Sequence, residues 1–133
     1  MNNELTTLKE KYKYDNFPQS LGIELIDLSP GYVKLEMTLK ENMTNIHGIG
    51  HGGAIFTLAD TALGLASNAR STPAVTLTIS INYLSPAKIG TKLIAVAEEE
   101  YLTKRTGVYN IKITSDEGKE IALARGTIYH QNF

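Results

Sequence analysis

The chain contains no cysteine among its 133 residues. Disulfide bonds, thiolate catalysis and cysteine-ligated zinc or iron–sulfur clusters are therefore excluded. It also has no excess of basic residues, because 13 Lys and Arg stand against 14 Asp and Glu, so it lacks the positive field that general nucleic-acid binding requires. No apolar run approaches the roughly 20 residues of a membrane span, and the N-terminus lacks the apolar core of a signal peptide. We expect a cytoplasmic protein that binds neither nucleic acid nor a membrane.

The hydrophobic pattern predicts one domain built around a single long helix. Residues 3–14 form a short amphipathic helix that Pro18 interrupts, and an apolar stripe from Ile55 to Ala66 marks the central helix at 53–69. Alternating apolar residues and turn signals predict strands at 22–28, 32–40, 74–84, 91–103, 106–115 and 119–130. The expected class is α+β, with an antiparallel sheet wrapped around the helix. We divide the chain into an N-terminal helical extension, 1–16, and a main domain, 17–133.

The most informative segment is NIHGIGHGG, residues 45–53, which runs directly into the central helix. A helix N-terminus presents unpaired backbone N–H groups and a partial positive charge, so Gly52 there can bind a carbonyl oxygen that becomes anionic during a reaction. Asp60 lies eight residues further along and can supply a base or a nucleophile. Together these features indicate acyl-transfer chemistry without a serine or cysteine nucleophile.

Helix geometry separates the two halves of this site. At 1.5 Å rise per residue, Gly52 and Asp60 are about 12 Å apart along the helix axis, too far to act on one carbonyl carbon. If two copies pack their helices antiparallel across a two-fold axis, Asp60 of one copy lies near Gly52 of the other. The sequence therefore predicts a dimer with two equivalent sites.

The side of the central helix opposite the apolar stripe is small and polar. Asp60 is the only charged residue between His51 and Arg70. A buried and unpaired carboxylate is costly, so we expect Asp60 to have hydrogen-bond partners or a solvent-filled pocket. The strand at 74–84 carries hydroxyl residues such as Thr76 on one face and apolar residues from Val75 to Tyr83 on the other.

These residues also carry a family resemblance. The pattern Asn45-x5-His51-Gly52-Gly53-x6-Asp60 is followed by YLSPAK at 83–88, TGVY at 106–109 and ARG at 124–126. Over roughly residues 17–130 the chain resembles the hotdog-fold acyl-CoA thioesterases, specifically the PaaI-type phenylacetyl-CoA thioesterase group. The resemblance implies hydrolysis of acyl-CoA without a metal or cofactor. It also implies pairing of the strand at 74–84 with its dimer mate, and commonly a dimer of dimers, a homotetramer.

The resemblance assigns roles to individual residues, each with an alternative. Asp60 matches the catalytic carboxylate and Gly52 the N–H that polarises the thioester carbonyl. Asn45 matches an asparagine that places the water or the carbonyl, although it also suits a turn that satisfies backbone groups. His51 matches a histidine that shapes the turn, and ordering the loop is favoured over proton transfer. Thr76 matches a hydroxyl residue near the carboxylate, or is simply a β-branched strand residue.

The groups that contact coenzyme A are less defined. His47 and His51 are four residues apart, but they lie in a glycine-rich loop without a third ligand, so we expect no metal site. Gly53 is expected to bind substrate beside Gly52. Basic residues at the sheet rim are candidates for the CoA phosphates, although most are expected to be ordinary solvated charges. These candidates are Arg70, Lys88, Lys92, Lys104, Arg105 and Arg125.

The residues suggest three possible functions. The first is hydrolysis of an aryl- or medium-chain acyl-CoA, with Asp60 as general base or as a nucleophile that forms an anhydride. The second, a hotdog dehydratase or hydratase, lacks its expected His-Phe-Pro motif. The third, a non-catalytic acyl-CoA-binding sensor, would need an output module for which the roughly twenty residues before the domain leave no room.

Overall fold

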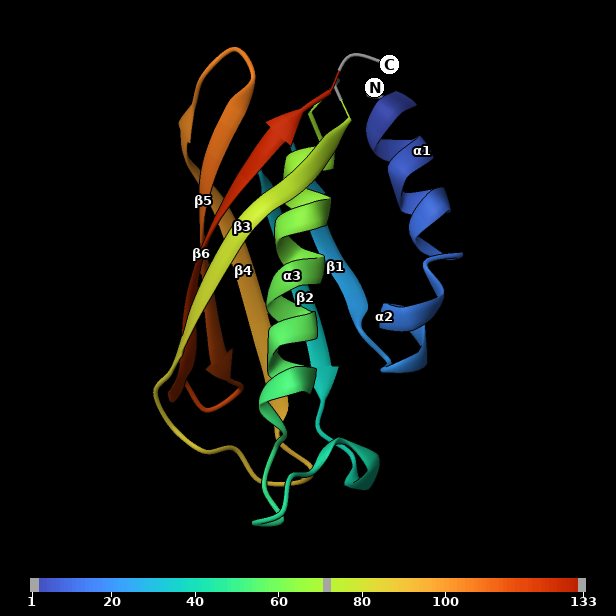
Figure 1. The fold of residues 1–133 in the computed structure, drawn as a ribbon. Coiled ribbons are helices and arrows are strands. Elements are labelled where there is room, and N and C mark those ends of the chain that lie inside the picture. Colours follow the sequence, from blue (N-terminus) through green and yellow to red (C-terminus); the bar gives the residue numbers. More distant parts are fainter. Residues whose placement is uncertain (1–2, 71–72, 132–133) are drawn as a thin grey trace.

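The computed structural model describes residues 3–70 and 73–131, in which one antiparallel sheet wraps around a central helix, α3 (Gly52–Asn68; Figure 1). Its strands follow the order β1-β2-β4-β5-β6-β3. Their bounds are β1 (Glu24–Ser29), β2 (Tyr32–Thr38), β3 (Ala74–Tyr83), β4 (Lys92–Leu102), β5 (Thr106–Ser115) and β6 (Glu120–His130). A short 3-10 helix, η1 (Glu41–Met43), begins the loop that leads into α3. The predicted α+β class and the predicted strands and central helix are confirmed.

Alternation along the strands decides which side of the sheet faces α3. In β2, Val33, Leu35 and Met37 are buried, whereas Lys34 and Glu36 between them are partly exposed. Because successive strand side chains point to opposite faces, the buried set forms one wall of the core. The strand pairs with β1 on one side and β4 on the other, so this wall continues across the sheet.

The apolar stripe of α3 fills the space inside the sheet. Its members are all buried: Ile55, Leu58, Ala59, Ala62, Leu63 and Ala66. The helix packs especially close to β6, because a Cβ atom placed on Gly126 would lie 2.4 Å from Cδ2 of Leu63. Such a distance is well inside van der Waals contact, so any side chain at position 126 would force Leu63 to move within the core.

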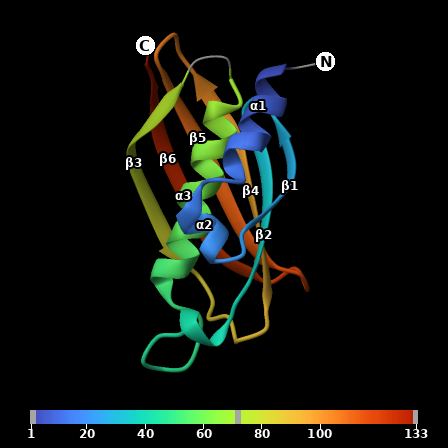
Figure 2. The ribbon, with the colours of Figure 1, turned by 90° about the vertical axis from the view of Figure 1, so that its right-hand side faces the viewer.

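Two N-terminal helices, α1 (Asn3–Tyr12) and α2 (Asn16–Ser20), lie against the side of α3 that faces away from the sheet (Figures 1 and 2). The hydroxyl of buried Tyr12 donates a hydrogen bond to the Ile23 carbonyl at 2.7 Å, which fixes this segment to the start of the sheet. The first helix ends at Tyr12, six residues before Pro18, and Pro18 itself lies inside α2, a helix that was not predicted. Pro18 occupies the first turn of α2, where a backbone N–H has no helical partner to lose. The predicted boundary between residues 16 and 17 falls within this helix.

Strand β3 lies at one end of the sheet order, and its outer edge pairs with no strand among the described residues. Val75 and Leu77 are 41% and 59% exposed, whereas Ala74, Ile79 and Ile81 pack against the core. The expected apolar face is therefore only half buried, because a register shift between Thr76 and Thr78 and the edge position leave the first half of the strand uncovered. An exposed apolar edge strand is a ready template for pairing with another chain.

The C-terminal end of α3 is tied to the sheet by a charged cluster. The Arg70 guanidinium donates to both carboxylate oxygens of Glu99, at 2.7 and 3.1 Å, and the hydroxyl of fully buried Tyr109 donates to Glu99 at 3.1 Å. Burial, followed by the charge and hydrogen bond of Glu99, raises the pKa of Tyr109.

Within the described residues, no helix is both long enough and apolar enough to cross a membrane.

Candidate active site

At the N-terminus of α3, one backbone donor has no acceptor among the residues that the structure describes. His51 is the N-cap, and its Nδ1 accepts a hydrogen bond from the Gly53 N–H at 2.8 Å. Its carbonyl oxygen accepts from the N–H groups of Ala54 and Ile55 at 3.0 and 3.2 Å. Among residues 52–55, only the Gly52 N–H has no acceptor in the part of the chain that the structure describes. This is the geometry that an oxyanion donor requires.

Tyr83, at the end of β3, holds this first residue of α3 in place. Its hydroxyl donates to the Gly52 carbonyl at 2.9 Å, and a Cβ on Gly52 would lie 3.3 Å from the ring. Burial raises the pKa of Tyr83. The two residues line a cavity of about 340 Å³ together with Asn45 and the loop at 84–87, which we call the glycine cavity. The contact of Tyr83 was not predicted, although the residue belongs to the motif at 83–88 that supports the family resemblance.

Asn45 organises the loop before the helix. Its Oδ1 accepts hydrogen bonds from the N–H groups of His47 and Ile49 at 2.9 and 3.3 Å. Gly48 in the same loop has φ +74°, a conformation that favours glycine. Asn45 therefore has the turn-forming role that was its alternative reading, and it also lines the glycine cavity. His51 likewise orders the backbone by accepting from Gly53.

Asp60 lies on the polar side of α3, in a cavity of about 510 Å³ between α3 and the N-terminal segment. We call it the aspartate cavity. Its lining residues are Leu8, Asp15, Phe17, Pro18, Phe56, Thr57, Asp60, Thr61, Gly64, Leu65 and Asn68. Desolvation by burial and, second, the negative charge of Asp15 raise the pKa of Asp60. A raised pKa is common for a carboxylate that exchanges protons in a reaction.

No hydroxyl group reaches Asp60 within the described chain. The hydroxyls of Thr57 and Thr61 donate instead to helix carbonyls, those of Gly53 and Thr57, at 2.8 and 2.6 Å. Thr76 is exposed on β3 and does not line the aspartate cavity. Of the two environments expected for Asp60, a hydrogen-bonded one or a pocket, the structure shows the pocket.

The contribution of the N-terminal segment to this cavity was not predicted. Asp15 is the N-cap of α2 and Phe17 lies within α2, and nothing in the local sequence marks either residue as lining a cavity with Asp60. Phe17 is 64% exposed although it lines the cavity, so the wall on this side is incomplete in a single chain.

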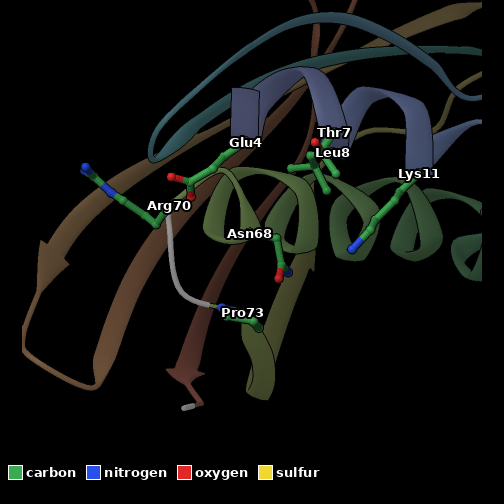
Figure 3. Close-up of a pocket in the computed structure, with 7 residues that line it drawn as sticks. All are labelled: Glu4, Thr7, Leu8, Lys11, Asn68, Arg70 and Pro73. Atoms are coloured by element: carbon green, nitrogen blue, oxygen red, sulfur yellow. The ribbon is translucent and has the colours of Figure 1, made fainter. Parts of the chain in front are cut away.

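A third cavity lies between α1 and α3, next to the aspartate cavity. It has a volume of about 370 Å³ and shares Leu8 and Asn68 with the aspartate cavity. Figure 3 shows Glu4, Leu8 and Lys11 extending from α1 toward the C-terminal half of α3, where Arg70 stands at the rim.

The basic residues expected at the sheet rim do not come together in one chain. Lys88 lies in the loop beside the glycine cavity, whereas Lys104 and Arg105 lie in the β4–β5 turn at the opposite end of the molecule (Figure 1). Arg105 donates to the Tyr129 hydroxyl at 3.4 Å. Arg125, exposed on β6, forms an ion pair with a neighbouring carboxylate, Glu100.

Comparison with known proteins agrees with this fold. Residues 47–122 match the thioesterase superfamily. The acyl-coenzyme A thioesterase PaaI of Escherichia coli is 38% identical over 115 residues, which cover 86% of this chain and 82% of that protein. The structure of the E. coli PaaI protein from the phenylacetic acid degradation operon superposes with a TM-score of 0.93 at 34% identity, covering 98% of this chain and 95% of that one. A Streptococcus mutans protein bound to acetyl CoA superposes with a TM-score of 0.80 at 31% identity, covering 83% and 89%. The chain therefore belongs to the thioesterase superfamily, which confirms the predicted hotdog fold, PaaI-type resemblance and class of enzyme, a thioester hydrolase.

Proposed function

We propose that this protein hydrolyses acyl-CoA thioesters to a free acid and CoA, at a site shared between two copies of the chain. The observation that carries the proposal is the placement of two functional groups on one helix. The unpaired Gly52 N–H and the Asp60 carboxylate line separate cavities, about 12 Å apart along α3. The relatives named acyl-coenzyme A thioesterase support the choice of substrate.

The chemistry follows from these two groups. The Gly52 N–H donates to the thioester oxygen as it becomes anionic, and Asp60 of the second copy acts on the carbonyl carbon. Asp60 either removes a proton from an attacking water or attacks the carbon itself to form an anhydride, which water then hydrolyses. In both routes the C–S bond breaks, the CoA thiolate leaves and takes up a proton, and the acid is released.

The edge of β3 supports a specific mode of dimer formation. Tyr83 of β3 lies beside Gly52 at the start of α3. The distance of about 12 Å from Gly52 to Asp60 along the helix equals the length of roughly four residues of a strand. Asp60 is therefore level with about Ile79 of β3. If β3 pairs antiparallel with β3 of a second copy, Tyr83 must face Ile79 for Gly52 to come level with Asp60. The two-fold axis then passes near Ile81.

A direct test measures CoA release with a thiol reagent over a panel of aryl-, short-, medium- and long-chain acyl-CoA thioesters. We expect turnover of at least one member, and loss of about 10² to 10⁴ in kcat for Asp60→Asn, the usual scale for a positioned acid or base. Asp116→Asn, an exposed carboxylate in the turn before β6, is the matched control and keeps the activity. A hydratase would consume enoyl-CoA without releasing CoA, and a binding protein would retain acyl-CoA without turnover. Either result would contradict the proposal.

Several finer expectations remain predictions. They concern catalytic roles for Asn45, His51 and Thr76, and binding of CoA by Gly53 and the basic side chains. We also propose assembly into a dimer of dimers, a cytoplasmic location, an aryl- or medium-chain acyl group, and a division of the chain at residue 16.

A further inference from the structure

The aspartate cavity is chemically unsuited to the CoA part of the substrate. Within the described residues that line it, none is a lysine, arginine or histidine, and its two charged groups are the carboxylates of Asp15 and Asp60. CoA carries several negatively charged phosphate oxygens, which such a cavity repels. Its remaining walls include the apolar side chains of Phe17, Phe56 and Leu65. These properties suit an uncharged acyl group.

We propose that the segment from Asp15 to Pro18 selects the acyl group, in that Phe17 and Pro18 provide an apolar wall and the Asp15 carboxylate excludes acyl groups that carry a negative charge. This inference rests on the proposed function and adds a substrate class to it, which is acyl-CoA with a neutral acyl group. Asp15 thus becomes a specificity-determining residue for the cavity in which Asp60 reacts.

Asp15 lines the cavity, and no ion pair within the described residues neutralises its charge. It stands at the N-cap of α2, but its side chain makes no capping hydrogen bond there. Its backbone makes the contacts instead, because its carbonyl oxygen accepts from the Gln19 N–H and its N–H donates to the Tyr12 carbonyl, both at 3.1 Å. The same negative charge contributes to the raised pKa of Asp60, which indicates that the two carboxylates interact across the cavity.

The size of the effect follows from Coulomb's law with solvent screening. A substrate carboxylate that enters the cavity lies within several ångströms of Asp15 in a partly solvated space. At such separations one repulsive charge changes binding by about five- to tenfold. We therefore expect Asp15 to set the preference between a neutral and an anionic acyl group of the same length.

The test compares kcat/KM for heptanoyl-CoA and adipoyl-CoA, whose acyl chains end at the same length in a methyl group and a carboxylate. Measurements at about pH 8 keep carboxylates ionised, because their ordinary pKa values lie near 4. We expect the adipoyl-to-heptanoyl ratio to rise about five- to tenfold in Asp15→Asn, and further in Asp15→Lys. Glu10→Gln removes an equal charge from the neighbouring α1, outside the cavity, and leaves the ratio unchanged.

Each outcome decides one question. An unchanged ratio in both Asp15 variants, with heptanoyl-CoA still hydrolysed, overturns the selection by Asp15 and leaves the proposed function intact. An equal rise in Glu10→Gln also overturns it, because the effect would then come from net charge alone. If the wild-type enzyme releases CoA from no thioester of the panel, the proposed function fails and this inference fails with it. Because Asp15 is exposed and its side chain makes no cap contact, both variants are expected to fold.

Discussion

Two inactive variants should restore each other's activity if every active site takes residues from both chains. Asp60→Asn keeps a side chain of nearly the same size but removes the ionisable oxygen. Gly52→Pro removes the N–H that lacks an acceptor in the described chain, and proline is favoured at the first position of a helix because that N–H is unpaired in any case. His51 already has φ −70° and ψ 133°, the extended conformation that a residue before proline prefers.

A matched variant separates loss of the donor from crowding. In Gly52→Ala, the new Cβ meets the Tyr83 ring at 3.3 Å, as a proline Cβ would, but the N–H remains. We expect Gly52→Ala to keep most of the activity. Gly52→Pro should lose about 10² to 10³ in kcat, the scale for one oxyanion donor.

The expected recovery can be calculated from symmetry. When equal amounts of the two inactive variants are unfolded together and refolded, about half of the dimers contain one chain of each kind. In such a dimer one site combines the intact Gly52 of the first chain with the intact Asp60 of the second, while the other site carries both lesions. About a quarter of all sites should therefore regain full activity.

The assay is CoA release from the best substrate, with the fraction of mixed dimers measured by native mass spectrometry. Activity should increase in proportion to that fraction. If both residues serve a site within one chain, every site in the mixture carries one lesion and no activity returns. Absence of recovery in a sample with the expected mixed dimers would refute the inference from the length of α3.

Four further predictions follow from the same contacts. Asp15→Asn should move the acid limb of the pH profile of kcat/KM to lower pH. The catalytic carboxylate must be ionised, and loss of the Asp15 charge lowers the pKa of Asp60. An acid limb at the same pH as in the wild type would show that the two carboxylates do not interact. Asp60→Asn should raise the Tm near neutral pH, because a raised pKa in the folded state means that the ionised group opposes folding. The gain should decline as the pH falls through that raised pKa and vanish below the ordinary pKa of aspartate in the unfolded chain; an equal gain at all pH values would contradict this origin. Tyr109→Phe should lower the free energy of unfolding by about 1–3 kcal/mol in urea titrations, because Glu99 loses a buried hydrogen-bond donor. An unchanged urea midpoint would show that this hydrogen bond does not stabilise the fold. Ile81→Cys gives the protein a single cysteine, because the natural chain has none. Mild oxidation should then produce a disulfide-linked dimer on a non-reducing gel. A variant that migrates only as a monomer on that gel would exclude a two-fold axis near Ile81.

The elements that the sequence predicts well are those whose pattern is local. Alternation in β2 and the apolar stripe of α3 identify their buried faces, because one buried side repeats at a fixed period along each element. Helix α2 was missed since five residues that include Pro18 show no periodicity. The exposure of Val75 and Leu77 also escapes the pattern, because it depends on the strand order that leaves β3 at the edge of the sheet.

The candidate site divides in the same way. Gly52 and Asp60 could be identified from one helix, since a helix start and a polar stripe are visible in the sequence. Asp15, Phe17 and Tyr83 reach the two cavities from other segments, and only the folded chain brings them there. The ion pair of Arg125 with Glu100 of β4, which spans the intervening strand β5, could not be read from the sequence either, and the predicted contact of Arg125 with CoA phosphates would have to compete with it.

The rigid spacing along α3 also restricts how this protein can change during evolution. One residue inserted between Gly52 and Asp60 would rotate the carboxylate by about 100° and shift it by about 1.5 Å along the axis. Asp60 would then leave its cavity, and the buried stripe of the helix would lose its register with the sheet. Differences in length are therefore expected to accumulate in the surface turns, whereas the helical segment between these two residues keeps a constant number of residues.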